Sequence, residues 1–432
     1  MKKVSIFWFR RDLRLEDNHG LFQALNESEN VLPLFIFDKN ILDKLGNKAD
    51  ARVEFIYDEI TKIHKQLESK DSSLLVKYGD PEAIYKELMS EYQIEAVFTN
   101  RDYEPYAKSR DEKIARLLQK HEIPLHKFKD QLIFEPGEIL NGSGEFYKVF
   151  TPFSKVWLSK FKPEKLEEFK PMHWKNLLKT SAFKLPTLKE IGFEKSDITI
   201  PSKTADEEII SHYDKTRDFP AKDGTSRLGI HLRFGTISIR KLALKASELN
   251  ATYLNELIWR EFYMMILAYN PQIVDKSFKP AYDRIPWRND EEEFKAWCEG
   301  RTGYPIVDAG MRELNTIGYM HNRIRMVVAS FLTKHLLIDW RWGEAYFAEK
   351  LLDYELASNN GGWQWAAGTG TDAQPYFRVF NPTSQQEKFD KNWKYIKKWI
   401  PEINSDKYPK PIVDHKFARQ RAIDTYKSAL NQ

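Results

Sequence analysis

The chain has 432 residues, 42% of them hydrophobic and 30% charged, so it can bury more than one sizeable core. Its 67 Lys and Arg against 63 Asp and Glu leave a net charge of +4, which neither demands nor excludes a polyanionic partner. The single cysteine, Cys298, excludes an internal disulfide framework and a cysteine-cluster metal site. Because no signal-peptide pattern and no run of eighteen apolar residues occurs, we expect a cytoplasmic protein without a membrane span.

The first third of the chain alternates short runs rich in Val, Ile and Phe with segments of helical spacing. The apolar runs are 4–9, 31–37, 74–78 and 95–99, and the clearest helical patterns are 51–67 and 106–120. Runs without internal polar alternation are typical of strands buried on both faces. Residues 1–130 are therefore predicted to form an α/β domain with a doubly wound parallel sheet. Neither a G-x-G-x-x-G motif nor a P-loop follows these strands, so no nucleotide site is indicated there.

Residues 131–204 are rich in Lys and interrupted by Pro, and we interpret them as a connector. Their basic residues alternate with Trp157, Phe161, Phe169 and Trp174, which would also suit nucleic acid, but a solvated linker is favoured. Helical spacing dominates residues 205–432 and predicts an all-α domain, which also holds most of the 12 tryptophans.

Standard catalytic patterns are missing from the sequence. The 10 histidines are scattered, and no H-E-x-x-H, C-x-x-C or G-x-S-x-G motif occurs. We therefore expect no metal site and no hydrolytic nucleophile. A large cofactor held by the helical domain could instead supply the chemistry.

Three segments of the helical region could surround such a cofactor. Small hydroxyl residues at 224–227 precede an apolar helical pattern, which suits either a phosphate cradle or a plain helix cap. Glu256, Trp259 and Arg260 share one helical face, as in a binding site or in a surface ion pair beside a buried ring. The run 359–362, Asn-Asn-Gly-Gly, predicts a turn or a close approach next to two indoles, in a flavin pocket or in a core.

Taken together, six motifs in this order resemble the photolyase/cryptochrome family over residues 4 to about 415. They are FWFRRDLRLEDNHGL, GTSRL, LNELIWREFY, TGYPIVDAGMRELNTIGYMHNRIRM, FLTKHLLIDWRWGEAYF and NNGGWQWAAGTGTDAQPYFRVFNP. Within the family, the sequence is most similar to class I cyclobutane pyrimidine dimer photolyases. The resemblance implies an all-α FAD-binding domain after the α/β domain. It also implies light-driven repair of cyclobutane dimers in DNA, by electron transfer from excited, reduced FAD to a flipped-out dimer.

The resemblance assigns the cofactor-binding residues. They are Tyr213, Thr225, Ser226, Arg227, Leu228, Arg325, Asp353, Glu355 and Asn359. Asn359 would face the redox-active ring nitrogen of the flavin, and Asp353 would pair with Arg325 beside the ring. The sequence departs from the family pattern at Gly229, where Ser is common, and at Tyr253, where a Trp can occur.

The resemblance also assigns a substrate site and a path for electrons. The residues for dimer and DNA are Glu256, Trp259, Arg260, Asn322, Arg323, Met326, Trp365, Arg217, Lys222 and Arg378. The catalytic set combines Glu256 and Asn359 with a tryptophan chain of Trp363, Trp340 and Trp287. In the (6-4) photolyase branch, histidines occupy the positions of Asn322 and Met326, so this sequence favours cyclobutane dimers.

Two questions stay open from the sequence. The family often holds an antenna chromophore, a folate or a deazaflavin, in its α/β domain, and Glu104 and Arg52 fall in segments that can line such a site. The alternative function within the family is a cryptochrome-type blue-light photoreceptor that repairs nothing. Retention of Glu256, Trp259 and Trp365 favours repair, and we expect a monomer that binds DNA containing pyrimidine dimers.

Overall fold

The computed structural model describes residues 1–431 and divides into two compact units. Unit 1 consists of residues 1–135, 161–203 and 228–247. Unit 2 consists of residues 136–160, 204–227 and the chain from 248 onward.

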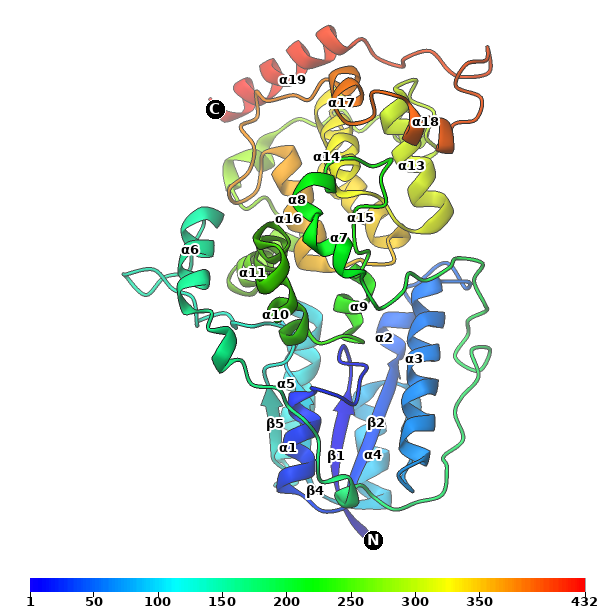
Figure 1. The fold of residues 1–432 in the computed structure, drawn as a ribbon, viewed down its shortest axis with the longest axis vertical. Helices are drawn as coiled ribbons and strands as arrows, with labels where there is room; N and C mark the ends of the chain where they lie inside the picture. Colours follow the sequence, from blue (N-terminus) through cyan, green and yellow to red (C-terminus); the bar gives the residue numbers. More distant parts are fainter. Residues whose placement is uncertain (432) are drawn as a thin grey trace. The chain divides into compact units, whose positions relative to one another are not determined.

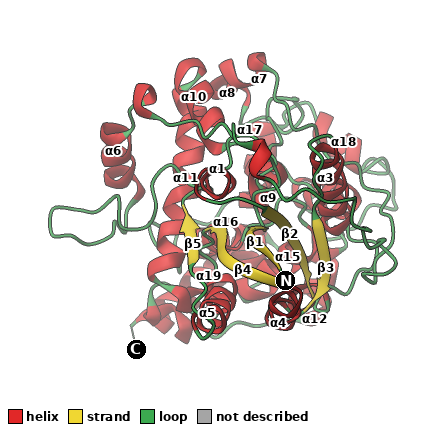
Figure 2. Ribbon diagram, turned by 90° about the horizontal axis from the view of Figure 1, so that it is seen from below, coloured by secondary structure: helices red, strands yellow, loops and turns green. Residues whose placement is uncertain are grey.

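Unit 1 is built on five parallel strands, which confirms the predicted α/β class. Figure 1 shows β1, β2, β4 and β5 among the helices, and the sheet order β3-β2-β1-β4-β5 can be followed in Figure 2. The strands are β1 (Lys2–Phe9), β2 (Val31–Asp38), β3 (Leu75–Gly79), β4 (Tyr92–Asn100) and β5 (Leu125–Phe128). The sequence did not predict β5, because its four residues, LHKF, include two polar ones and form no apolar run.

Helices cover both faces of this sheet, as the view in Figure 2 shows. Phe7 and Phe9 of β1 belong to the core shared with α1 and α3, whereas Ile6 and Trp8 belong to the core shared with α4 and α5. Alternate side chains of one strand point to opposite faces, so each face receives a full apolar row. The helices are α1 (His19–Glu27), α2 (Lys39–Leu42), α3 (Ala51–Glu68), α4 (Pro81–Glu91) and α5 (Pro105–Gln119).

The predicted connector, 131–204, is divided between the units rather than standing as a separate solvated linker. Leu177, Ile191 and Phe193 are buried in the sheet core on the side of α1 and α3, which places residues 161–203 in unit 1. This stretch has only short helices, η1 (Pro163–Lys165) and η2 (Trp174–Asn176). Unit 1 also takes α9 (Gly229–Phe234) and most of α10 (Ile239–Leu249), which the sequence analysis counted in the helical domain.

Unit 2 is helical, as expected, and its main core surrounds α13, α14, α15 and α16. Residues 309–337 do not form one continuous helix, because Gly318 adopts a left-handed conformation (φ 64°) and ends α13. The longer helices are α6 (Phe150–Lys160), α11 (Ala251–Tyr269), α12 (Glu291–Cys298), α13 (Pro305–Ile317), α14 (Asn322–Ser330), α15 (Trp340–Lys350), α16 (Leu356–Ala367), α17 (Pro382–Phe389) and α19 (His415–Leu430). The shorter ones are α7 (Glu207–Ser211), α8 (Tyr213–Thr216), η3 (Pro271–Val274), η4 (Pro280–Arg284), the π-helix η5 (Phe331–His335) and α18 (Lys394–Trp399).

Two structural absences apply to residues 1–431. Within this range no helix combines the length and the apolar character that a bilayer crossing requires. In the same range no group of three or more His, Cys, Asp or Glu residues is placed to hold a metal ion.

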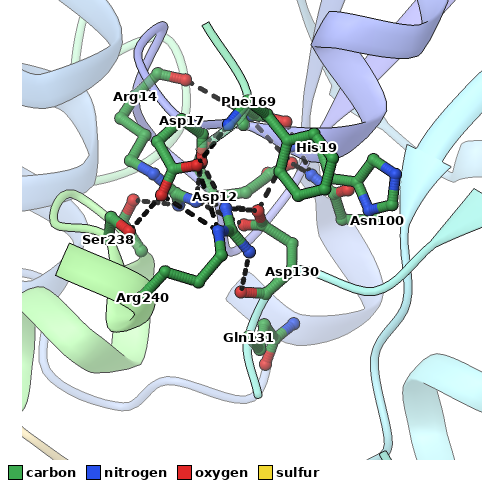
Figure 3. A network of polar contacts seen from close by, with 12 residues as sticks. Asp12, Arg14, Asp17, His19, Asn100, Asp130, Gln131, Phe169, Ser238 and Arg240 are labelled. Atoms are coloured by element: carbon green, nitrogen blue, oxygen red, sulfur yellow. Dashed lines mark hydrogen bonds and ion pairs between the residues drawn. The ribbon is translucent and has the colours of Figure 1, made fainter. Parts of the chain in front are cut away.

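A buried network of charges joins distant segments of unit 1 (Figure 3). Arg240 of α10 donates to Asp130 at 2.8 Å and to both carboxylate oxygens of Asp17 at 3.0 Å. Arg14 donates to both oxygens of Asp130 at 2.8 Å. Burial opposes ionisation of Asp130, but the two guanidiniums outweigh burial and lower the pKa of Asp130. The network therefore fastens α10 to the loops that follow β1 and β5.

Replacing Asp17 by Asn should destabilise unit 1 strongly. The change removes a charge that faces the buried guanidinium of Arg240, and breaking one partner of a buried ion pair costs about 3–5 kcal/mol. Urea unfolding at neutral pH measures the loss. The control is Glu16→Gln, whose carboxylate is 87% exposed and pairs with Lys241 at 3.6 Å, and it should stay within about 0.5 kcal/mol of wild type. Equal effects of both substitutions would contradict this account.

Candidate active site

A cavity of about 410 Å³ lies in unit 2 and gathers most of the residues that the sequence assigned to a site. Its walls come from α11, α14 and α16, from Arg217 and Phe347, and from the segment between α15 and α16. The predicted residues in this lining are Arg217, Glu256, Trp259, Arg260, Asn322, Arg325, Met326, Asp353, Glu355, Asn359, Trp363 and Trp365. Gly362, which the sequence analysis named within the run 359–362, also lines the cavity. Sequence reasoning did not single out the other lining residues, Tyr263, Ala329, Phe347, Leu351, Tyr354 and Ser358.

Glu256 on α11 is a carboxylate of this cavity that pairs with a cation from another segment. The Nη1 group of Arg217 donates to Glu256 Oε1 at 2.5 Å. Burial raises the pKa of Glu256, and Arg217 opposes that shift. The predicted common face of Glu256, Trp259 and Arg260 is confirmed, since all three line the cavity, and the ion pair of Glu256 with Arg217 joins this face to the segment after α8.

Two indoles contribute to the cavity wall from different helices. Trp259 lies on α11 and stacks on Phe150 with ring centroids 3.6 Å apart and planes within 5°. Trp365 lies on α16 and is half-buried. One face of Trp259 is thus fixed by Phe150, which holds the indole rigidly in the wall.

The start of α14 is held by an imidazole. His321 accepts a hydrogen bond from the backbone N–H of Arg323 at 3.1 Å, and burial lowers the pKa of His321 to about 4, so it stays neutral and able to accept. Asn322 and Met326, one turn apart, then both line the cavity. Arg323 does not belong to the lining, and its guanidinium pairs with Asp218 at 2.5 Å.

Arg325 and Asp353 form the ion pair that the resemblance implied, at 2.9 Å. Burial opposes the charge of Arg325, but Asp353 outweighs it and raises the pKa of Arg325. Glu355 caps α16, since its Oε2 accepts from the backbone N–H of Ser358 at 3.2 Å and from the Ser358 hydroxyl at 2.8 Å. Glu355 therefore caps α16 and also lines the cavity.

The run Asn359–Gly362 is helical and not the turn that its composition allowed. It forms the middle of α16. The close approach, the other expectation, is confirmed at Gly361, where an added Cβ would lie 2.2 Å from Cδ1 of Tyr263 on α11. Gly362 faces the cavity, and an added Cβ there would meet no atom within 4 Å. Gly361 thus lets α16 pack closely against α11, and Gly362 leaves room for a ligand beside the backbone.

The Asn359 amide is held from behind by α15. Its Nδ2 group donates to the backbone oxygen of Glu344 at 3.1 Å and to Glu344 Oε1 at 2.8 Å. Glu344 does not line the cavity, and burial raises its pKa against the effect of this hydrogen bond. Sequence reasoning missed Glu344, because a glutamate on an exposed-looking helix carries no pattern that reveals such a partner.

The hydroxyl run before α9 does not cap that helix, which has no side-chain cap. Thr225 instead hydrogen-bonds the Tyr319 hydroxyl at 3.0 Å, and Ser226 hydrogen-bonds the Tyr253 hydroxyl at 2.7 Å. Arg227 has a left-handed backbone (φ 53°). The capping interpretation is therefore wrong, and these hydroxyls lie among tyrosines of unit 2.

The remaining predicted cofactor residues lie outside the cavity lining. Tyr213 packs edge-on against Tyr253 at 5.1 Å between ring centroids. Leu228 is buried and belongs to unit 1, as the residue before α9.

The three tryptophans of the predicted chain share one apolar cluster. Trp363 and Trp340 are buried in it, and Trp287 packs against it half-buried. Only Trp363 reaches the cavity lining. Its nearest ring neighbours include Trp297, at 6.0 Å between centroids, a ring for which the sequence analysis proposed no role.

The remaining basic and acidic candidates lie elsewhere on the two units. Lys222 and Arg378 are exposed on unit 2. In unit 1, Glu104 pairs with Arg11 at 3.0 Å and with Arg233 at 2.7 Å, and Arg52 pairs with Asp50 at 2.5 Å. Both residues named for an antenna are thus engaged in ion pairs within their own unit.

The cavity residues fit a flavin. The Arg325–Asp353 pair offers charged donor and acceptor groups, Asn359 offers an amide, and Gly362 leaves open space beside α16. Aromatic and apolar walls with a few convergent polar groups are what a cofactor of this kind requires.

Comparisons with known proteins agree with this reading. Residues 5–172 match the family described as DNA photolyase, and residues 253–406 match the FAD binding domain of DNA photolyase. The deoxyribodipyrimidine photo-lyase of Vibrio cholerae is 38% identical over 99% of this chain and 100% of its own length.

Two solved structures are similar over the whole chain. A class III photolyase from Agrobacterium tumefaciens has a TM-score of 0.88 at 33% identity, covering 100% of this chain and 98% of its own. An archaeal photolyase from Sulfolobus tokodaii, described with two FAD molecules, has a TM-score of 0.85 at 36% identity, covering 99% of this chain and 100% of its own. The chain therefore belongs to the DNA photolyase family, as a FAD-binding enzyme of the deoxyribodipyrimidine photo-lyase type.

Proposed function

We propose that this photolyase repairs cyclobutane pyrimidine dimers in DNA by light-driven electron transfer inside the cavity of unit 2. The observation that carries the proposal is the arrangement of Glu256, Trp259, Asn322, Met326 and Trp365 around one cavity. A carboxyl group, two indoles, an amide and a thioether can together enclose a pair of bases.

Other residues of the same cavity lining would hold FAD. Arg325 and Asp353 would bind the polar edge of the flavin ring, and Asn359 would contact the ring from α16. Thr225 and Ser226, whose hydroxyls reach the unit 2 tyrosines, would bind the phosphates and the ribityl chain. When bound and reduced, FAD supplies the electron on excitation.

The substrate groups would hold a flipped-out dimer. Trp259, fixed by Phe150, and Trp365 would stack on the splayed bases. Glu256 would hydrogen-bond a base and so stabilise charge as it develops there. Its raised pKa, which follows from burial, favours a carboxyl that can hold a proton once Arg217 moves toward a DNA phosphate.

The amide of Asn322 and the thioether of Met326 favour cyclobutane dimers. Opening the cyclobutane ring breaks two carbon–carbon bonds and returns the electron, so the dimer needs no net proton transfer. Neither an amide nor a thioether exchanges protons near neutral pH, whereas an imidazole does. The side chains of Asn322 and Met326 therefore suit a reaction in which an electron is transferred and returned without net proton transfer.

The first test is repair itself. Protein reconstituted with FAD and chemically reduced should restore the absorbance of a thymine-dimer oligonucleotide near the thymine band under blue light and not in darkness. Added salt should weaken binding of the oligonucleotide steeply, because Arg217, Lys222 and Arg378 would contact phosphates. If the protein binds reducible FAD but the absorbance of the oligonucleotide does not recover under blue light, the repair proposal is contradicted and a photoreceptor function is favoured.

Glu256→Gln should retain FAD and lose repair efficiency. The substitution keeps the shape but removes the charged or proton-donating group, and a hydrogen bond to a charged group contributes about 1.5–3 kcal/mol. We expect about tenfold less repair per absorbed photon, measured on the reduced holoenzyme. The matched control is Glu248→Gln, an exposed carboxylate just before α11, which should repair like wild type. Unchanged repair in Glu256→Gln would remove the assigned role.

Trp287→Phe should separate flavin photoreduction from repair. The half-buried Trp287 would be the outer end of the tryptophan chain, and phenylalanine is too hard to oxidise to replace it. Photoreduction of the oxidised holoenzyme, followed at the flavin absorption band, should slow severely, whereas repair by chemically reduced enzyme should persist. Trp342→Phe, in the same cluster, is the control and should alter neither. Equal losses of both activities in Trp287→Phe would contradict the electron path.

A further inference from the structure

A run of lysines begins at the end of α17 and continues over α18 of unit 2. Its five exposed members are Lys388, Lys391, Lys394, Lys397 and Lys398. The acidic residues of the described stretch 387–399 are the exposed Glu387 and the buried Asp390. Five cations and one exposed carboxylate thus share a short surface, although the whole chain has a net charge of +4. The potential of this surface is therefore far more positive than the total charge indicates.

The backbone of α18 is held firmly while its lysines stay in solvent. Tyr395 and Ile396 are buried in the main core of unit 2. The carboxylate of Asp390 accepts hydrogen bonds from the backbone N–H groups of Tyr395 and Ile396, at 3.1 and 3.0 Å. The three lysines of α18 are spaced three and four residues apart and share the opposite side of the helix. A partner that binds these lysines therefore finds the backbone already ordered, which lowers the entropic cost of binding.

The lysines of α18 repel one another within the helix. On α4, by contrast, the ammonium group of Lys86 pairs with the carboxylate of Glu82 one turn earlier, at 2.7 Å. The sequence of α18, KYIKKW, contains no acidic residue, and like charges three or four residues apart destabilise a helix. An anion bound across this face would relieve the repulsion. The face therefore suits a partner with several negative charges.

The lysine run starts next to the cavity. The ring of Phe389 contacts two cations, since the guanidinium of Arg323 lies 4.3 Å and the ammonium of Lys388 lies 5.2 Å from its centre. Arg323 directly follows Asn322, which lines the cavity. Both α17 and α18 pack against α13 (Figure 1). Cationic side chains thus continue from the edge of the cavity lining, through the end of α17, to α18.

We propose that Lys391 and the three lysines of α18 form a second contact surface for DNA, which binds the phosphate backbone of the duplex beyond the dimer. This proposal rests on the proposed function in taking DNA as the substrate, and it adds a surface outside the cavity. From Lys394 to Lys398 the helix rises about 6 Å, whereas the phosphates of one strand follow each other every ~3.4 Å along the duplex axis. The face of α18 can therefore reach about two phosphates. Such contacts carry no sequence preference, as repair at any site requires.

The test removes three charges from each of two helices of unit 2. The α18 variant combines Lys394→Gln, Lys397→Gln and Lys398→Gln. The matched α19 variant combines Lys416→Gln, Arg419→Gln and Lys427→Gln, all at exposed positions. Both are prepared with bound FAD, and fluorescence anisotropy in the dark measures their DNA affinity over a series of salt concentrations. The DNA is a duplex that extends about two helical turns to each side of one thymine dimer.

The α18 variant should bind this duplex more weakly than wild type. The slope of log affinity against log salt concentration should be less steep by about two, because each phosphate contact contributes about 0.9 to it. The α19 variant should keep the wild-type slope. Replacing the same three lysines of α18 by arginine should also keep that slope, because arginine retains the charge and binds phosphate.

A short single strand that carries the dimer and one nucleotide on each side provides the second control. It can reach the cavity but not α18, so the α18 variant should bind it as tightly as wild type. Equal affinity for this strand also shows that the variant is folded and that its cavity is intact.

Three results would overturn the proposal. They are an unchanged duplex slope in the α18 variant, an equal decrease of the slope in the α19 variant, and an equal loss of affinity for the short strand. An undamaged duplex of the same length separates this test from the test of repair, because α18 would contact phosphates alone and its variant should lower the slope there too. A protein that shows this decrease but repairs no dimer would refute the repair proposal and leave the α18 surface standing.

Discussion

The architecture of the cavity depends on how closely α16 packs against its neighbours. A Cβ at Gly361 would lie 2.2 Å from Tyr263 on α11, and a Cβ at Gly343 on α15 would lie 2.1 Å from the Trp363 ring. No side chain larger than hydrogen fits at either contact. The backbone of α16 therefore touches the Tyr263 ring of α11, and the backbone of α15 touches the Trp363 ring of α16. Asn359 and Trp363 of α16 thus line the same cavity as Glu256 and Trp259 of α11. A larger residue at either glycine would push α16 outward and separate groups that must act on one ligand.

Two carboxyl groups near the cavity share a property and differ in partner. Burial raises the pKa of Glu256 and of Glu344 alike. Glu256 faces the guanidinium of Arg217, which favours the charged form of the Glu256 carboxylate while the two groups are paired. Glu344 faces the amide of Asn359, which carries no charge. The hydrogen bond between them therefore orients the amide without neutralising the carboxylate. The first arrangement suits a group that responds to substrate, and the second suits one that holds a neighbour still.

Sequence patterns predicted the sheet well because its strands are buried on both faces and so appear as uninterrupted apolar runs. They missed β5, whose LHKF has no such run, and they predicted a connector where Leu177 and Phe193 are in fact buried. The site residues came from ordered motifs rather than from periodicity. Glu344 was missed because its role depends on the distant Asn359, and helical spacing cannot reveal a partner on another helix.

The chain passes from unit 2 to unit 1 at the end of the hydroxyl run 224–227, just before α9, so local patterns alone could not show which unit the run contacts. Thr225 and Ser226 belong to unit 2, where they bond tyrosines, whereas Leu228 begins the stretch that unit 1 takes. Arg240, near the start of α10 in the second half of that stretch, is bound by Asp17 and Asp130. The network around Arg240 fixes residues 228–247 within unit 1 without using any cavity residue. Stability in unit 1 and ligand contacts in unit 2 therefore rest on separate groups of side chains, so each can be altered by substitution while the other is measured.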